Sequence, residues 1–250
     1  MRIMIFDTET TDINKCFCYN VGYVIYDTET ETFVDSKEFV VEQIWHNLPL
    51  FSTAYYANKR QFYVKNMRAK KIKLDKFGRI CQTMIRDIKK HDVVAAFAYN
   101  SPFDEKVFNF NCDWFKCNNP FDTIPIYDIR GHVHHSLIDD SFKEFCEKYS
   151  LFTDSGNYST TAETVYKYIT SNSEFIESHT ALDDARIETE ILVNCIKRNK
   201  KMEWLKDYPV KTTIPREVEK TLTIKTKTKE YTFTCKKYTV YRSKNLIKLK

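Results

Sequence analysis

The chain has 250 residues and a formal net charge of +5, and 42% of its residues are hydrophobic. This length suits one large domain with an appendage, and the apolar fraction supplies a substantial core. With only 4 Gly and 6 Pro the chain is not a linker-rich protein, and no apolar run reaches transmembrane length. We therefore expect a soluble, cytoplasmic protein without a membrane partner, whose 8 Cys are reduced thiols.

Charge is divided unevenly along the chain. Residues 206–250 carry 13 Lys and Arg against 4 acids, a net charge of +9, whereas the first 205 residues carry −4. We therefore divide the chain into a main domain, residues 1–205, and a basic extension, residues 206–250. Alternating apolar residues from Leu222 to Cys235 predict that the extension is a small β appendage. Its basic face either binds a polyanion or a partner protein, or is simply solvated.

The first strand carries the first group of candidate site residues. An apolar run with Ile3, Ile5 and Phe6 predicts a strand that is buried on both faces. Side chains alternate along a strand, so Asp7 and Glu9 should project from one face a few ångströms apart. Two such carboxylates repel each other unless a proton or cation lies between them, and oxygen ligands suit Mg²⁺ or Mn²⁺. From this stretch alone, two acids in a polar loop entrance explain the pattern equally well.

The following segments predict the body of an α/β domain. Apolar runs at 21–26 and 32–41 indicate two further strands, which short links join into an antiparallel meander. Helical patterns dominate from residue 44 to residue 90. A buried strand is expected at 93–98, and a short edge strand at 124–128, where a Pro is tolerated.

The second group of candidate residues follows the strand at 93–98. Ser101 is a predicted N-cap, and Pro102 fits the first position of a helix. Asp104 then lies in the first helical turn, where the helix dipole favours an ionised carboxylate. The alternative is that Asp104 is a helix-start residue with no other role.

The third group opens a late helix. Thr180 is a predicted N-cap with Asp183 at the capping-box position, so Asp183 has a structural explanation. Asp184 instead shares the apolar stripe that contains Ile187, and a carboxylate on a packed stripe needs a partner such as a bound cation. His179, just before the helix, can approach the same point, although a single histidine is more often an ordinary surface residue.

These three groups together resemble the DEDDh, or DnaQ-like, class of 3′–5′ exonucleases. The resemblance rests on Asp7-Thr8-Glu9, Asn100-x-x-Phe103-Asp104 and His179-x-Ala181-Leu182-x-Asp184, which occur in the order typical of that class. The class includes the proofreading subunit of bacterial replicative polymerases, oligoribonuclease and ribonuclease T. The resemblance implies a ribonuclease H-like fold, with a mixed five-stranded sheet flanked by helices. One departure is Asp12, where many relatives have Gly.

The resemblance also implies a role for each motif residue. Four acids would hold two divalent ions, Mg²⁺ or Mn²⁺, about 4 Å apart. His179 would be the general base that takes a proton from the attacking water. The metal ligands would be Asp7, Glu9, Asp104 and Asp184. The residues near the terminal nucleotide would be Thr10, Thr11, Asn100 and Phe103.

The expected activity is hydrolysis of single-stranded DNA from its 3′ end to 5′-mononucleotides, in proofreading, replication or repair and with a DNA polymerase as a possible partner. The compact form is most similar to stand-alone phage or bacterial exonucleases, and a phage protein would act in the host cytoplasm. One alternative is an exoribonuclease of the oligoribonuclease or ribonuclease T kind, because the motifs do not fix recognition of the 2′-OH. Another is a catalytically silent nucleic-acid-binding or polymerase-tethering module on the same fold.

Cysteine and histidine spacing does not favour a structural zinc site. Cys16-x-Cys18, Cys112-x4-Cys117 and the His132–His135 segment form no pair of pairs with the spacing of a zinc finger. Tyrosines are candidates for base stacking, although each is more often a core or surface residue. They are Tyr19, Tyr55, Tyr56 and Tyr99.

Overall fold

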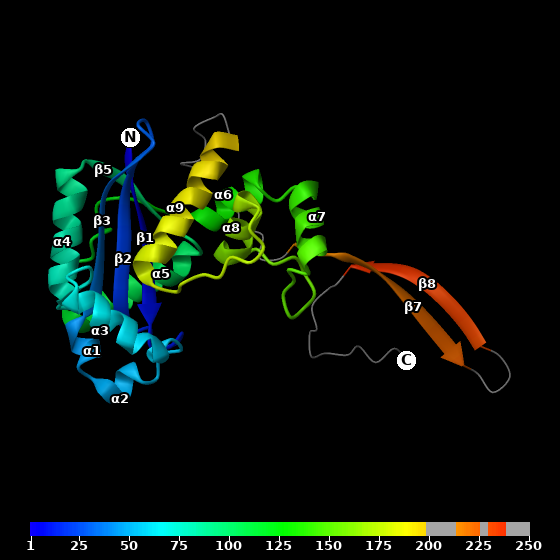
Figure 1. Cartoon of the computed structure of the whole chain (residues 1–250), viewed down its shortest axis with the longest axis horizontal. Coiled ribbons are helices and arrows are strands. Elements are labelled where there is room, and N and C mark those ends of the chain that lie inside the picture. The colour runs from blue at the N-terminus through cyan, green and yellow to red at the C-terminus, as the bar shows by residue number, and fades with distance from the viewer. Residues whose placement is uncertain (199–213, 226–229, 239–250) are drawn as a thin grey trace.

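The computed structural model describes residues 1–198, 214–225 and 230–238. A mixed six-stranded sheet in the order β4-β3-β2-β1-β5-β6 forms the centre of the molecule (Figure 1). Strand β1 pairs antiparallel with β2 and parallel with β5, and β2 pairs antiparallel with β3. The strands are β1 (Arg2–Thr10), β2 (Cys18–Asp27), β3 (Thr32–Val41), β4 (Lys73–Asp75), β5 (Val93–Ala98) and β6 (Ile126–Asp128).

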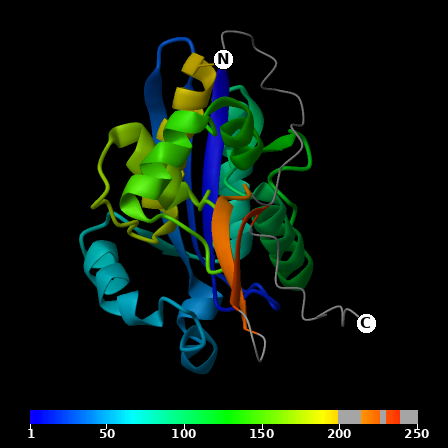
Figure 2. The ribbon, with the colours of Figure 1, turned by 90° about the vertical axis from the view of Figure 1, so that its right-hand side faces the viewer.

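Helices cover both faces of this sheet. One core contains side chains of α4 and α5, and the other contains side chains of α6 to α9. Figure 2 shows the sheet between α4 and α5 on one side and α8 and α9 on the other. The helices are α1 (Glu42–Trp45), α2 (Leu48–Phe51), α3 (Arg60–Arg68), α4 (Phe77–Lys90), α5 (Ser101–Phe115), α6 (Ile129–Ser136), α7 (Asp140–Tyr149), α8 (Ala162–Thr170) and α9 (Ala181–Arg198), with a 3-10 turn η1 (Ala57–Lys59) before α3.

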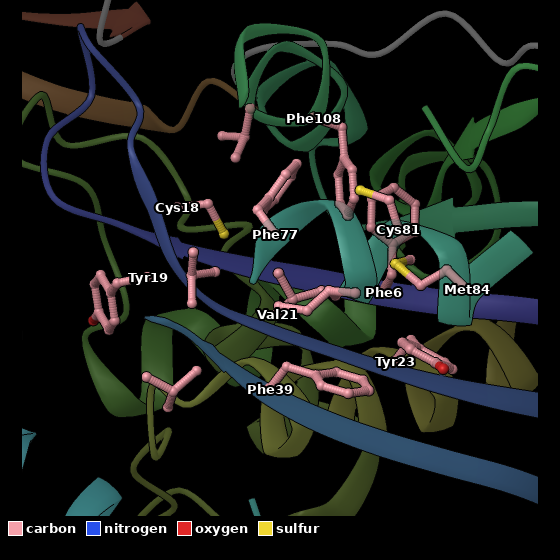
Figure 3. Close-up of a cluster of buried hydrophobic side chains, with 14 of the residues drawn as sticks. Phe6, Cys18, Tyr19, Val21, Tyr23, Phe39, Phe77, Cys81, Met84 and Phe108 are labelled. Atoms are coloured by element: carbon pink, nitrogen blue, oxygen red, sulfur yellow. The ribbon is translucent and has the colours of Figure 1, made fainter. Parts of the chain in front are cut away.

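Strand β1 is central because its side chains feed both cores. Met4 and Phe6 point to the α4–α5 side, while Ile3 and Ile5 point to the α9 side, and all four are fully buried. Figure 3 shows part of the first core, in which the rings of Phe6 on β1 and Phe77 on α4 each contact Phe108 on α5. Such two-sided burial makes β1 a rigid support for the acidic residues at its end.

The antiparallel meander, the buried strand β5 and the edge strand β6 confirm the sequence predictions. The predicted five-stranded sheet is wrong by one strand, because β4 lies within the stretch expected to be helical and pairs parallel with the end of β3. A strand of three residues has no periodicity that the sequence could reveal. It forms because Leu74 aligns with Val40 on the sheet edge.

The extension contains the expected strand pair. Strands β7 (Glu217–Lys225) and β8 (Glu230–Tyr238) form an antiparallel hairpin that extends away from the main domain (Figure 1). At its base, Arg216 donates two hydrogen bonds to the carboxylate of Glu147, at 2.7 and 2.9 Å. Residues 206–213, 226–229 and 239–250 of the predicted extension lie outside the described residues. Within the described chain, no helix combines the length and apolar character needed to cross a bilayer.

Candidate active site

The end of β1 presents two acids on the face covered by α9. Asp7 and Glu9 are half-buried, and their oxygens lie within 4.8 Å of each other and of an oxygen of Asp184. The alternation of a strand explains why the first two share a face. Asp184 lies about 175 residues further along the chain, so its position next to them depends on how α9 packs against the sheet.

Gly22 permits the close packing of α9 against the sheet. It lies directly opposite Asp7 in the β1–β2 register. A Cβ at this position would be 2.2 Å from the backbone nitrogen of Leu182 and 2.3 Å from the carbonyl carbon of Ala181. Only a residue without a side chain lets the first turn of α9 lie on β2 at this distance. Because Gly22 has no side chain, α9 packs closely enough to place Asp184 next to Asp7.

Asn20 fixes the position of the same helix end. Its Oδ1 accepts hydrogen bonds from the first backbone N–H of α9, on Ala181 at 2.9 Å, and from the hydroxyl of Tyr63 at 3.0 Å. Its Nδ2 donates to the carbonyl of Phe39 at 2.9 Å and to Glu38 at 3.2 Å. Every polar atom of this fully buried amide is therefore used, which gives α9 a single position on the sheet.

The cluster of Asp7, Glu9 and Asp184 is electrostatically unbalanced. Burial and the neighbouring carboxylates raise the pKa of Asp7 well above its usual value, and that of Asp184 to about 9. Burial raises the pKa of Glu9 to about 8, although the charge of Lys59 opposes the shift. The buried Oδ1 of Asp184 has no hydrogen-bond partner within the described part of the chain. Carboxylates in this state need either a proton or a cation to balance their charge.

Asp104 lies in the first turn of α5, as the sequence predicts, and is 2% exposed. Its Oδ1 accepts a hydrogen bond of 2.6 Å from the hydroxyl of Thr8, and burial raises its pKa to about 7. Its charge is the largest carboxylate contribution to the raised pKa of Asp7. Asp104 is thus a neighbour of the close group of three but does not belong to it.

The predicted N-cap of α5 is wrong by one residue. Asn100, not Ser101, precedes the helix, because Asn100 adopts a left-handed backbone with φ of 64°. Asparagine tolerates this conformation better than most residues do. Its backbone N–H donates to Oδ1 of Asp128 at 2.9 Å, and its exposed side chain stays available at the end of β5.

Sequence reasoning missed a fifth acid, Glu188. It is 3% exposed, and its Oε2 accepts a hydrogen bond of 3.1 Å from the backbone N–H of Tyr99 at the end of β5. Burial and the charge of Asp104 raise its pKa well above the usual value. The available signal was its position four residues after Asp184, on the same face of α9.

His179 belongs to a second group of titratable residues, with Glu163 and Glu177, and not to the carboxylate cluster. Its backbone is left-handed, with φ of 47°, and its ring stacks on Tyr56 with centroids 4.5 Å apart. Nδ1 lies 3.6 Å from Oε2 of Glu177, which is too long for a hydrogen bond. Lys59 donates to the carbonyls of Ser178 and His179, the latter at 3.1 Å. Burial, followed by the charge of Lys59, lowers the pKa of His179.

The other predicted substrate residues have mixed surroundings. Thr10 is half-buried at the end of β1, Thr11 is 1% exposed, and Phe103 packs against the first core. Asn100 lines a cavity of about 390 Å³ together with Tyr99 and residues of the 153–162 segment. Of the tyrosine candidates, Tyr19 is a core residue, whereas Tyr55 is 88% exposed.

The residues present fit a site for hard divalent cations. Asp7, Glu9 and Asp184 offer oxygen ligands within a few ångströms, and Asp104 lies next to them. Mg²⁺ and Mn²⁺ bind to carboxylates of this kind. The unpartnered oxygen of Asp184 supports the same assignment, because a bound cation would satisfy it.

Comparison with solved structures shows the same architecture in 3′-exonucleases. A full-length 3′-exonuclease is similar over 78% of this chain and 60% of its own, with a TM-score of 0.52 and 15% identity. The nuclease domain of 3′hExo, a DEDDh family member bound to rAMP, is similar over 85% of this chain and 97% of its own, with a TM-score of 0.51 and 13% identity. Exonuclease I from Methylocaldum szegediense is similar over 80% of this chain and 41% of its own, with a TM-score of 0.50 and 15% identity.

The chain therefore has the ribonuclease H-like α/β fold of DEDDh 3′-exonucleases, as the sequence motifs predict. No protein-family model and no curated protein matches the sequence. The chain spans 60% of the length of the first of these structures and about two fifths of exonuclease I.

Proposed function

We propose that the protein is a Mg²⁺- or Mn²⁺-dependent 3′–5′ exonuclease that hydrolyses single-stranded DNA to 5′-mononucleotides. One observation carries the proposal: oxygens of Asp7 and Glu9 on β1 and of Asp184 on α9 converge within 4.8 Å, and Oδ1 of Asp184 has no hydrogen-bond partner in the part of the chain described. A protein that used these acids only for stability would pair them with cations or donors. The motif order and the shared fold support the same class of reaction.

Each residue has a chemical task in this proposal. Asp7, Glu9, Asp104 and Asp184 would hold two divalent ions, which activate water and stabilise the leaving 3′-oxygen when bound. His179 accepts the proton of the attacking water, and its lowered pKa keeps the imidazole neutral for this purpose. Tyr56 limits the rotation of the His179 ring by stacking on it.

In this proposal the terminal nucleotide lies at the end of β5. Asn100 projects there from a left-handed turn and lines the cavity of about 390 Å³. Thr10 is half-buried at the end of the neighbouring strand β1 and offers a backbone and a hydroxyl group, whereas the hydroxyl of Thr11 is buried. The exposed ring of Tyr55 can stack on a base further from the 3′ end.

RNA is the second candidate substrate. The structure of 3′hExo that resembles this chain contains rAMP, so the shared fold accepts a ribonucleotide in that protein. The basic extension, residues 206–250, would increase affinity for either nucleic acid through its net charge of +9. Docking on a DNA polymerase, in proofreading or repair, stays a prediction of the sequence motifs.

The deciding experiment follows the degradation of matched 5′-labelled single-stranded DNA and RNA, with Mg²⁺, with Mn²⁺ and with a chelator. The native chain is compared with His179→Ala and with the control His46→Ala, because His46 is exposed and outside the site. We expect a metal-dependent ladder that shortens from the 3′ end, is lost in His179→Ala and persists in the control. The relative rates on the two oligomers identify the preferred sugar.

Two outcomes would count against the proposal. If neither oligomer is shortened but both bind, the protein is a catalytically silent nucleic-acid-binding module. If Asp7→Ala still cleaves at the native rate, the carboxylate cluster is not the site of hydrolysis.

A further inference from the structure

Three thiols converge on the opposite side of the sheet from the carboxylate cluster. Cys81 comes from the second turn of α4, Cys112 from the last turn of α5, and Cys117 from the segment after α5. The three Sγ atoms lie within 4.8 Å of one another, and those of Cys81 and Cys112 are 4.0 Å apart. Figure 3 shows Cys81 among the rings of the first core, near Phe108.

The local backbone brings Cys117 back to the other two residues. Lys116 ends α5 in a left-handed conformation with φ of 52°, and the N–H of Cys117 donates to the carbonyl of Cys112 at 3.0 Å. Cys117 then packs against Gly78. A Cβ added to Gly78 would be 3.3 Å from the Cβ of Cys117. Gly78 and Cys81 are one turn apart on α4, so the same face of that helix meets the thiol of Cys117.

The spacing of the sulfur atoms suits a metal ion better than a disulfide bond. A tetrahedral Zn²⁺ site with Zn–S bonds of about 2.3 Å places its sulfur atoms roughly 3.8 Å apart. The 4.0 Å between Cys81 and Cys112 is close to this edge length. A disulfide would require sulfur atoms about 2 Å apart and would leave one of the three thiols unused.

Access and charge are compatible with an ion. Cys81 and Cys112 are buried, but Cys117 is half-buried, and both Cys112 and Cys117 line a cavity of about 370 Å³. The hydrogen bond with Cys81 lowers the pKa of Cys112. The same contact raises the pKa of Cys81, and burial raises that of Cys117 to about 11, so a metal must displace the protons of these two thiols. Thiolates prefer soft ions such as Zn²⁺, whereas the carboxylate cluster prefers hard ones.

We propose that Cys81, Cys112 and Cys117 form a zinc site with three thiolate ligands and a fourth position that faces the cavity. Binding forms three Zn–S bonds and releases the thiol protons to solvent. The ion would connect α4 to the end of α5, the helix whose first turn carries Asp104. The sequence did not predict this site, because Cys81 is separated from the other two by a strand and most of a helix.

The test uses the full chain, reduced and freed of metal. Co²⁺ is added as a spectroscopic probe in the presence of excess Mg²⁺, which occupies the carboxylate cluster. We expect one equivalent of Co²⁺ to give a thiolate-to-metal charge-transfer band in the near ultraviolet, and one equivalent of Zn²⁺ to remove it. Carboxylate ligands give no such band, so the signal reports only on sulfur.

Variants assign the signal to these residues. Cys112→Ala and Cys117→Ala should lose the band, whereas the control Cys146→Ala, a buried thiol on α7, should keep it. Zn²⁺ should also raise the Tm of the native chain but not that of Cys117→Ala. Because Cys117 is only half-buried, this variant keeps the test valid even if Cys112→Ala fails to fold. Absence of the band in the native chain, or a band that persists in Cys117→Ala, would overturn the proposal.

Discussion

Two buried aspartates, each on a helix that packs against the sheet, differ in whether the fold supplies partners for their carboxylates. Asp87 on α4 is 6% exposed, accepts a 2.5 Å hydrogen bond from the hydroxyl of Tyr23 and forms an ion pair with Lys37. Asp184 on α9 is equally buried, yet its neighbours are Asp7 and Glu9, and its Oδ1 has no partner within the described residues. Both helices pack on the same sheet, so burial alone does not explain the difference.

The contrast separates an acid whose charge is balanced within the fold from one whose charge is not. Around Asp87 the chain supplies the cation itself, so the group is complete without a ligand. Around Asp184 the chain supplies more negative charge, with Glu188 and Asp104 adding to the excess. A group that destabilises the metal-free fold in this way is expected where a cation binds.

The largest effect is expected from neutralising each acid in turn. Asp184→Asn should reduce nuclease activity by at least about 10³-fold, equivalent to about 4 kcal/mol of activation free energy. The same change should raise the Tm of the metal-free protein at neutral pH, because the buried carboxyl, whose pKa is raised to about 9, must take up a proton on folding and Asn does not. Thermal unfolding without metal and single-turnover cleavage with Mg²⁺ measure the two effects.

Asp87→Asn provides the matched control. It should leave cleavage intact but lower the Tm, because Lys37 and Tyr23 lose their partner at a cost on the order of 1–3 kcal/mol. If both variants lower the Tm of the metal-free protein to the same extent, the distinction between the two acids is wrong.

Gly22→Ala tests whether the carboxylate cluster of Asp7, Glu9 and Asp184 depends on the close approach of α9 to β2. The new Cβ would overlap the backbone at Leu182, so α9 must shift away from β2 and take Asp184 with it. We expect a loss of stability of about 1–3 kcal/mol together with a strong loss of activity. Gly78→Ala is the control, since its Cβ meets only Cys117 at 3.3 Å and alanine favours a helix. Native activity in Gly22→Ala would contradict the assigned role.

Sequence patterns predicted the residues that carry their own local signal. Asp7, Asp104 and Asp184 occupy the end of a strand or the start of a helix, and such positions can be read without knowing the fold. Gly22 and Asn20 could not be identified in this way. Their roles depend on tertiary contacts. The β1–β2 register places Gly22 opposite Asp7 and Asn20 opposite Glu9, and the start of α9 packs against both.

The same reason explains why two further features could not be found from the sequence. The short strand β4 exists only because β3 offers an edge, and the third thiol near Cys112 and Cys117 comes from a different helix. Glu188 was within reach of sequence reasoning, because it follows Asp184 by one helical turn. It was missed because no motif of the class includes that position.

Mg²⁺ should stabilise the fold only through the carboxylate cluster of Asp7, Glu9 and Asp184. At a hundredfold excess over its Kd, Mg²⁺ should add about 2.7 kcal/mol to the free energy of unfolding, if one ion binds the folded state alone. The gain should disappear in Asp184→Asn and persist in Asp87→Asn. Differential scanning calorimetry at increasing Mg²⁺ concentration provides the measurement. A gain that survives in Asp184→Asn would place the ion elsewhere.

The smallest effect concerns the pH dependence of cleavage. Activity should rise with pH as His179 loses its proton, because only the neutral imidazole can accept one from water. Burial and the charge of Lys59 lower the pKa of His179 from its ordinary value of 6.5, so the rise should occur below that pH. Lys59→Met removes one of these two causes and should move the rise to higher pH.

The profile is measured as kcat at saturating Mg²⁺, so that altered metal affinity does not enter. Lys143→Met, on α7, is the control and should leave the profile in place. The charge of Lys59 disfavours the protonated form of His179 and does not change the neutral form. The rate at high pH, where His179 is neutral, should therefore stay within a few-fold of the native rate. A profile that does not move in Lys59→Met would mean that His179 is not the group whose titration limits cleavage. The base would then have to be sought among the other groups near Asp184, beginning with Glu177, whose pKa burial raises to about 7.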